Sequence, residues 1–233
     1  MNKILKEILI GVLLGDAHIG KTGLDKAFIS FEQSKNKESY INHLFSLTKE
    51  NGLALMENSL KEYKRESLLN KSATESLYFR TQSLEALRPL ADMFLDESGN
   101  KIIPSNIADH LTPRSLAYWI MDDGQQVKKG GVTLCTDSFN SNDVNILREA
   151  LKTNFQLTTS IHKKKGKNDA LYERIYIWKD SLQDFKTSLK PHMHESMLYK
   201  INEENIQKEV KETLKIENNT EFEVESDIDI FDL

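Results

Sequence analysis

The chain lacks disulfides, long hydrophobic runs and a positive net charge, and each absence limits what it can be. With a single cysteine, Cys135, it cannot form an internal disulfide, so we expect a reducing compartment. No apolar run approaches the roughly eighteen residues needed to cross a bilayer, which argues against a membrane protein. The first residues, MNKILKEILIG, lack the cleavage pattern of a signal peptide.

The net charge of −5 argues at first against a nucleic-acid partner. Residues 202–233, however, contain eleven acidic residues and three lysines, so this segment alone carries −8. Subtracting −8 from −5 leaves +3 for residues 1–201. A modestly basic body with an acidic tail is compatible with DNA binding if the positive charge is concentrated on one face. The composition of the tail is typical of a flexible segment, with a possible helix at 206–216.

Two nearly continuous apolar stretches are present instead of amphipathic stripes. They read LIGVLLGDA at Leu9–Ala17 and LAYWIMDDG at Leu116–Gly124, and each ends on an acidic residue beside a small one. A helix that is apolar all round must be buried. Each stretch would therefore deliver a carboxylate, Asp16 or Asp123, from the interior to one point on the surface. We predict that the two helices pack together.

These stretches resemble the paired signatures of the LAGLIDADG homing endonucleases, specifically the single-chain, two-motif type related to the omega intron endonuclease of mitochondria. The resemblance covers roughly residues 5–201. It implies an α+β fold in which two pseudo-symmetric αββαββα halves pack through the paired helices and form antiparallel, saddle-shaped sheets for DNA. It also implies an intron-encoded monomer that cuts one phosphodiester per strand of a long double-stranded target, across the minor groove.

Hydrophobic periodicity predicts the elements of the first half. We expect helices at 2–14, 40–50 and 83–94 and strands at 27–34, 53–63 and 77–81, with one further strand in the turn region 18–27 that the resemblance implies. Ser83 and Ser115 are predicted to cap helices. Gly11 and Gly15 lie four apart, and because each glycine costs up to about 1 kcal/mol in a helix, we expect a second helix to approach closely there.

The second half repeats the first. Phe28–Ser34 corresponds to Val132–Ser138 at an offset of 104 residues, and Phe79 maps onto Ile177 at an offset of 98. A duplication predicts pseudo-two-fold symmetry. We therefore expect an N-terminal half at 1–100, a proline-containing linker at 101–114, a C-terminal half at 115–201 and the acidic tail at 202–233.

The two carboxylates predict a metal site. Two carboxylates close together do not both stay ionised without help, and a divalent cation with oxygen ligands, Mg²⁺ or Mn²⁺, supplies it. Such an ion activates water and neutralises charge on a phosphodiester. The resemblance implies that Asp16 and Asp123 are the catalytic, metal-binding acids, one per strand. Gly15 and Asp122 are further metal-site candidates, although Asp122 could instead hydrogen-bond the backbone or water.

Two lysines occupy matching places in the repeat. Lys101 maps onto Lys200, and both resemble the pocket lysines of the family. Their predicted catalytic role is to hold the water network or to stabilise the charge that develops on the phosphorane. The alternative is that each is a solvated surface lysine.

Basic side chains gather at the predicted strand ends, and HKKKGK at 162–167 would form a hairpin tip. The candidates for phosphate contacts are Lys35, Lys37, Lys61, Lys64, Arg65, Arg80, Lys128, Lys129, Lys163, Lys164, Lys165 and Lys167. The candidates for reading base edges are Gln33, Asn58, Thr133, Thr136 and Arg174. A solvated charged loop is the alternative for each run.

Two other functions are compatible with the same scaffold. The resemblance also covers RNA maturases that assist intron splicing, and a non-catalytic DNA-binding regulator is a third possibility. The presence of both acids favours the nuclease. An organelle-encoded chain would act in a mitochondrion or chloroplast, and otherwise in the cytoplasm of a bacterium or phage host.

Overall fold

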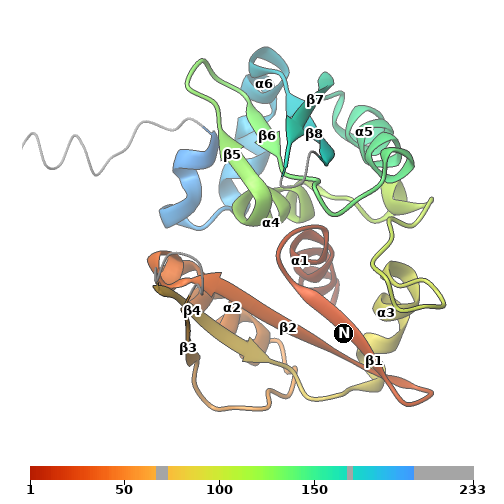
Figure 1. Ribbon diagram of the computed structural model, residues 1–233, viewed down its shortest axis with the longest axis vertical. Helices are drawn as coiled ribbons and strands as arrows, with labels where there is room; N and C mark the ends of the chain where they lie inside the picture. The colour runs from red at the N-terminus through yellow and green to blue at the C-terminus, as the bar shows by residue number, and fades with distance from the viewer. Residues whose placement is uncertain (67–72, 167–169, 202–233) are drawn as a thin grey trace, which may run out of the picture. The chain divides into compact units, whose positions relative to one another are not determined.

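The computed structural model describes residues 1–66, 73–166 and 170–201, which form two halves with the same order of elements (Figure 1). The first half comprises α1 (Lys3–Leu14), β1 (His18–Thr22), β2 (Lys26–Ser34), α2 (Glu38–Glu50), β3 (Lys61–Glu66), β4 (Ala73–Arg80) and α3 (Arg88–Phe94). The second comprises α4 (Pro113–Asp123), β5 (Gly124–Gln126), β6 (Val132–Leu134), α5 (Ser141–Phe155), β7 (Thr159–Lys165), β8 (Leu171–Ile177) and α6 (Lys179–Leu189). The predicted α+β class and the αββαββα repeat are confirmed.

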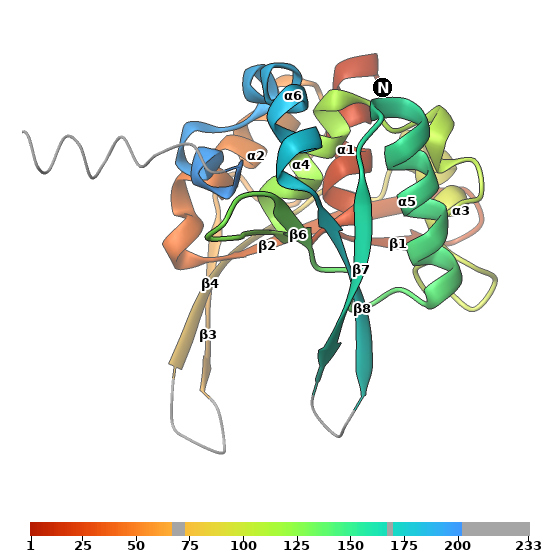
Figure 2. The ribbon, with the colours of Figure 1, turned by 90° about the horizontal axis from the view of Figure 1, so that it is seen from above.

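Each half contains one four-stranded antiparallel sheet. The strand orders are β1-β2-β4-β3 and β5-β6-β8-β7, so the two sheets have equivalent topology. In the first half α2 packs on β2 and β4 and α3 packs on β1 and β2, while α5 packs on β8 in the second. The β3–β4 and β7–β8 hairpins extend beyond the helices in the same direction (Figure 2).

Helices α1 and α4 lie side by side and are buried on nearly all sides (Figures 1 and 2). Gly11 and Gly15 make the close approach possible, as predicted. A Cβ atom on Gly11 would lie 2.4 Å from the carbonyl oxygen of Ser115, and one on Gly15 would lie 2.5 Å from Cβ of Asp122. The side chains of both halves join in one continuous core around this helix pair.

Two predicted helix caps are wrong. Thr112, not Ser115, caps α4: its Oγ1 accepts from the Ser115 backbone N–H, and the Ser115 hydroxyl accepts in return from the N–H of Thr112. Pro113 takes the first helical position, where its missing N–H costs nothing. Ser83 donates its hydroxyl to Thr22 Oγ1 instead of capping, because a 3₁₀ turn, η2 (Glu85–Leu87), precedes α3.

The strand predicted at 53–63 is largely wrong. Residues 53–60 form no regular strand, although Leu53 is buried and Leu55 makes an isolated bridge to Thr81. Their apolar side chains contact the core from a loop, which gave them a strand-like pattern. The regular strand β3 starts only at Lys61, and β4 starts earlier than predicted, at Ala73.

The repeat offset of 104 is wrong for the central strands. Val132 and Leu134 face the core, as do Ile29 and Phe31, whereas Phe28 faces outward. A one-residue slip exchanges the two faces of a strand. An offset of 103 matches the faces, aligning Ile29 with Val132. At the helix ends the offset of 104 does hold. Gly52, shortly after α2, and Gln156, directly after α5, lie 104 residues apart and share a left-handed backbone conformation, with φ angles of 80° and 56°.

The predicted linker, 101–114, contains a short 3₁₀ turn, η3 (Ile107–Asp109), that packs on α5. The chain after α6 continues through η5 (Lys190–His192) and η6 (Glu195–Ile201), and η6 packs beside α4 and β5.

The predicted helix at 206–216 and the acidic tail lie outside the described residues. Within the described residues, no helix is long and apolar enough to cross a membrane.

Candidate active site

The C-terminal ends of α1 and α4 meet and bring three carboxylates together. Asp16 follows the last turn of α1, and Asp122 and Asp123 close α4. The backbone N–H of Asp16 donates to Oδ2 of Asp122 at 3.3 Å, so the two helix ends are joined directly. The side chain of Asp16 is 39 % exposed, whereas Asp122 is buried.

Asp122 points into the interior. Its Oδ1 accepts a hydrogen bond from the Tyr40 hydroxyl at 2.8 Å and one from Gln33 Nε2 at 3.2 Å, in addition to the contact of Oδ2 with the backbone of Asp16. The Asp122 carboxylate thus links α4, the end of α1, β2 and α2. The predicted alternative, a helix-end residue that hydrogen-bonds backbone or water, holds only in part, because one partner is backbone and two are the side chains of Tyr40 and Gln33.

Gln33 belongs to this site and not to the exposed sheet face where it was predicted. It occupies the core-facing row of β2, after Ala27, Ile29 and Phe31, and is only 5 % exposed. Its Nε2 donates to Asp16 Oδ2 at 2.8 Å. The available signal in the sequence was a polar residue in a row that is otherwise apolar.

The two predicted lysines reach the ends of the paired helices. Lys101, held next to the end of α3 by a bridge to Leu95, donates from Nζ to the carbonyls of Gly15 at 3.0 Å and Ala17 at 3.3 Å. Lys200, carried by η6, donates to the carbonyls of Met121 and Asp122, the latter at 2.9 Å. Each half therefore places one buried ammonium on the carbonyls at the end of a motif helix, which disfavours the solvated-lysine alternative.

Burial and crowding change the protonation of these groups. Burial, and next the neighbouring Asp16, raise the pKa of Asp123 to about 7 against the opposing effect of Lys101 and Lys200. Burial and Asp16 likewise raise the pKa of Asp122. Burial lowers the pKa of Lys101, and it lowers that of Lys200 to about 8. Burial, more than the neighbouring charges, therefore disfavours the ionised form of Asp123 in the free protein.

Among the described residues, no three His, Cys, Asp or Glu side chains form a metal-binding cluster. A cation on either side could therefore combine the carboxylate of Asp16 or Asp123 with backbone carbonyls and with oxygens of water or phosphate. The carbonyls of Gly15 and Asp122 lie beside these acids, and each accepts from an ammonium group while a second lone pair remains. Hard divalent ions prefer such oxygen ligands.

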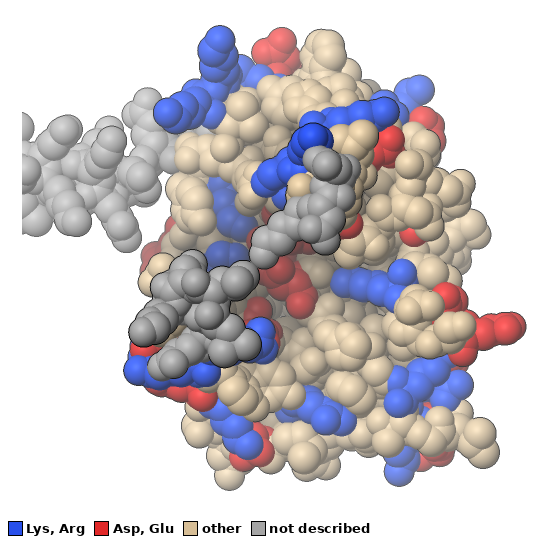
Figure 3. All heavy atoms as spheres, in the orientation of Figure 1, with Lys and Arg blue, Asp and Glu red and all other residues tan. Residues whose placement is uncertain are grey.

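A groove of about 360 Å³ opens beside the acids. Asp16, Glu32, Gln33, Ser34, Lys37, Arg65 and Ser76 line it. Lys37 reaches to 3.9 Å from Asp16 Oδ2, so it lies in this groove as well as near the predicted phosphate-binding surface. Figure 3 views the side from which the hairpins project: acidic side chains gather in a central hollow, with lysine and arginine side chains around it.

Strand alternation divides the predicted DNA-contacting residues of the hairpins between two faces. Lys61 and Arg65 lie on the outward face, whereas Lys64, which pairs with Glu75, lies on the opposite one. In β7, Lys164 faces outward and Lys163 and Lys165 do not, since Ile161 on their side faces the core. Lys167 lies outside the described residues. Consecutive basic residues of one strand thus cannot all face the same DNA.

The other candidates differ in their exposure. Thr133 lies on the outward face of β6, Asn58 in the exposed loop before β3, and Lys128 and Lys129 in the exposed turn after β5. Lys35 pairs with Glu62 and Glu75. The Arg80 guanidinium lies 3.5 Å from the centroid of the Phe28 ring on the outward face.

Thr136 cannot read bases as predicted. It is fully buried and donates its hydroxyl to the carbonyl of Glu173 at 2.6 Å. Its position in the core-facing row after Val132 and Leu134 matches that of Gln33 in the first half. The two halves therefore differ at this position: Gln33 donates to the catalytic candidate Asp16, whereas Thr136 donates to a backbone carbonyl and to neither acid.

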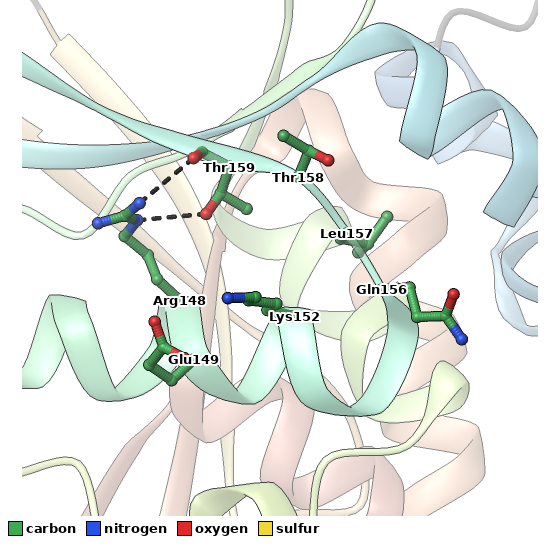
Figure 4. A pocket seen from close by; sticks show the side chains of 7 residues that line it. All are labelled: Arg148, Glu149, Lys152, Gln156, Leu157, Thr158 and Thr159. Carbon is green, nitrogen blue, oxygen red and sulfur yellow. Dashed lines mark hydrogen bonds between the residues drawn. The ribbon is translucent and has the colours of Figure 1, made fainter.

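A second concavity, of about 500 Å³, lies between α5 and the start of β7 (Figure 4). Arg148 lines it and donates to Oγ1 and the carbonyl of Thr159, at 3.2 and 3.3 Å. Lys152 also lines this pocket, and the only carboxylate in its lining is that of Glu149. It contains no acid pair, so the ends of α1 and α4 are the better candidate for catalysis.

Comparison with known proteins agrees with this geometry. The model of the LAGLIDADG DNA endonuclease family matches residues 6–185. A protein described as "Probable intron-encoded endonuclease 1" of Wickerhamomyces canadensis is 33 % identical over 209 residues, covering 86 % of this chain and 85 % of its own. The cytochrome b mRNA maturase bI2 of Saccharomyces cerevisiae is 28 % identical over 207 residues, covering 86 % of this chain but only 48 % of its own.

Among solved structures, the homing endonuclease I-WcaI bound to its DNA recognition sequence superimposes with a TM-score of 0.75 at 29 % identity, covering 86 % of each chain. The fold, the paired motifs and the family match all point the same way, and the chain belongs to the LAGLIDADG DNA endonuclease family.

Proposed function

We propose that this protein is a homing endonuclease that hydrolyses one phosphodiester in each strand of a long double-stranded DNA target. The observation that carries the proposal is the meeting of Asp16 and Asp123 at the ends of two buried helices, between two equivalent sheets. One acid from each half suits a reaction that is repeated on two strands related by a local two-fold axis. Acids so close together favour cleavage across the narrow minor groove.

The cofactor we propose is Mg²⁺ or Mn²⁺. Asp16 and Asp123 would each hold an ion on their own side, together with the carbonyls of Gly15 and Asp122 and with water and phosphate oxygens. When bound, such an ion activates water and offsets negative charge on the phosphate. Burial, and next the neighbouring Asp16, raise the pKa of Asp123, and a divalent cation would favour its ionised form.

The protein's own side chains would orient the Asp16 carboxylate and neutralise negative charge on the phosphate. Gln33 fixes the direction of the Asp16 carboxylate through its 2.8 Å hydrogen bond. Lys101 and Lys200 keep ammonium groups next to the acids, where they would stabilise negative charge as it grows on the phosphate. The reaction adds one water across the bond between phosphorus and the leaving sugar oxygen.

A cleavage screen tests the proposal. The full chain is incubated with a plasmid library of candidate targets in Mg²⁺, Mn²⁺, Ca²⁺ or EDTA, beside a matched Asp16→Asn, Asp123→Asn double variant. We expect linear product with Mg²⁺ or Mn²⁺, binding with little turnover in Ca²⁺, and no cutting by the double variant, since Ca²⁺ holds carboxylates without activating water as well. Full activity in EDTA would contradict the metal dependence.

A second candidate is an RNA maturase, and it is favoured by the similarity to cytochrome b mRNA maturase bI2. The chain spans about half of that relative, so the similarity does not extend to the whole maturase. Retention of both acids supports the nuclease and is compatible with a dual role. A splicing assay on the host intron with the double variant separates them, because splicing help that survives loss of both acids is not cleavage.

The relatives also suggest where the chain works. Intron-encoded endonucleases and a cytochrome b mRNA maturase are among its matches. We infer an intron-encoded protein of an organelle, in which the single cysteine, Cys135, would remain reduced.

A further inference from the structure

A carboxylate–guanidinium pair lies on the outward face of the first sheet, next to the acids. In the first sheet Glu32 accepts from Arg65 Nη2 at 3.0 Å and from the Ser76 hydroxyl at 2.8 Å. Glu32 faces outward because its neighbours in β2, Phe31 and Gln33, face the core. Arg65 and Ser76 share that face, since Leu77 beside Ser76 is buried.

The second sheet has a pair of the same chemistry. Arg174 donates from Nε to Oδ1 of Asp137 at 2.6 Å and from Nη2 to Oδ2, a two-point contact that also lowers the pKa of Asp137. Its Nη1 donates to Gln125 Oε1 at 3.1 Å, so each of its nitrogens is engaged. The Arg174 side chain is only 10 % exposed, so it is less suited to reading bases than predicted. The pair ties the turn after β6 to β8 and has no residue-by-residue counterpart in the first sheet.

The presence of a carboxylate on a surface proposed to face DNA requires an explanation. Opposite a phosphate it would repel the target, and an outward lysine or serine would serve better. Opposite base edges it has a partner, because the amino group of cytosine donates in the major groove. The guanine of the same pair offers two acceptors, O6 and N7, which arginine binds with two parallel hydrogen bonds. A carboxylate beside a guanidinium therefore complements the major-groove edge of a G·C pair.

The geometry of the first pair suits this reading. The Arg65 side chain is 68 % exposed and that of Glu32 is 35 % exposed, so both are accessible to a ligand. A guanidinium has five N–H donors, more than its contact with one carboxylate oxygen uses. Asp16, Glu32 and Arg65 line the same groove, which places the pair beside the cleavage position.

We propose that Glu32 with Arg65 is a specificity-determining pair that reads a G·C base pair beside the cleavage position of the half-site that Asp16 serves. The inference rests on the proposed endonuclease function and names part of its substrate. The competing explanation is that the ion pair only stabilises the strands. The protein contains a control for that explanation: Lys64 and Glu75 form a 2.7 Å ion pair between the same two strands, β3 and β4, on the opposite face.

The test is a binding profile of the full chain in Ca²⁺ over all single base-pair substitutions of its target. For the wild-type protein we expect a C·G preference of about tenfold at one position beside the cleavage position of the half-site that Asp16 serves. Glu32→Gln should lower that preference about tenfold and favour A·T there, since an amide pairs with adenine. Arg65→Lys keeps the charge but loses the two-point contact, and should weaken the preference at the same position.

Glu75→Gln is the matched control and should leave the whole profile unchanged. An unchanged Glu32→Gln profile, or an equal loss of affinity at every base pair, would overturn the inference while leaving the endonuclease function intact. A wild-type protein without any sequence preference would instead refute the proposed function, and the inference with it.

Discussion

At the scale of single residues, the site depends on one buried acid that does no chemistry in our proposal. The Asp122 carboxylate accepts hydrogen bonds from Tyr40, Gln33 and the backbone N–H of Asp16. Its side chain also fills the space left by the missing side chain of Gly15. Through Gln33 it helps to hold the exposed Asp16 carboxylate in place. Tyr40 carries no sign of this in the sequence, because an aromatic residue near a helix start usually packs in the core.

Tyr40→Phe tests this arrangement. It removes the hydroxyl that donates to Asp122 and leaves a buried acceptor with one partner fewer, so we expect the free energy of unfolding to fall by about 1–3 kcal/mol. Cleavage should fall as well, because Gln33 and Asp16 lose their common support. Urea denaturation and initial cleavage rates measure the two effects. The control is Tyr199→Phe, at an exposed hydroxyl without a hydrogen bond to any described residue, and an equal effect there would refute the argument.

At the scale of elements, the close packing of α1 against α4 sets the distance between the catalytic acids. The helices can approach because Gly11 and Gly15 present bare backbone to Ser115 and Asp122. An ordinary helix pair keeps its axes about 8–10 Å apart, with side chains between them. Each glycine here lies against backbone or Cβ atoms, which cannot move aside as the end of a flexible side chain could.

We expect Gly11→Ala to destabilise the protein despite the better helix propensity of alanine. The new Cβ would lie 2.4 Å from the Ser115 carbonyl oxygen and 2.7 Å from Tyr118 Cβ, so the helices must separate. Overpacking of this kind costs about 1–3 kcal/mol, more than the gain of about 1 kcal/mol from replacing glycine. Thermal unfolding measures the change. Ile4→Ala, at an exposed position of the same helix, should be close to neutral, and similar stability of the two variants would contradict the packing argument.

At the scale of the whole molecule, pseudo-symmetry places one acid in each half, and we propose that each serves one strand of the target, but the surroundings of the acids are unequal. Gln33 bonds Asp16, whereas Thr136 in the matching row of the second half bonds a backbone carbonyl. Gly15 in the first motif stands where Asp122 stands in the second. The two halves share a fold while their sites have diverged in supporting residues.

Asp16→Asn and Asp123→Asn test the division of labour. Each substitution removes a negative ligand but preserves size, so folding and DNA binding should survive while metal binding on that side fails. We expect each variant to nick supercoiled plasmid that carries the target, cutting the strand served by the intact acid. Nicked, linear and uncut plasmid separate on a gel. Linear product from either variant would remove that aspartate from the active site, and loss of both cuts would indicate one ion shared by the two acids.

Much of this protein could be read from local sequence. Continuous apolar stretches ending in Asp16 and Asp123 predicted buried paired helices, because burial on all sides leaves no room for polar positions. Gly11 and Gly15 predicted a close approach, and the internal repeat predicted two equivalent halves. These inferences succeeded because each depends on neighbouring residues or on regular spacing along the chain.

What only the tertiary structure decided depends on which way side chains face and which distant residues meet. Gln33 and Thr136 were predicted to read bases from their side-chain types, but both are buried, Gln33 in the core-facing row of β2 and Thr136 just after β6. The meeting of Tyr40 with Asp122 crosses 82 positions of the chain, and that of Asp137 with Arg174 crosses 37. Such contacts follow from the packing of helices and strands in space, which no local pattern records.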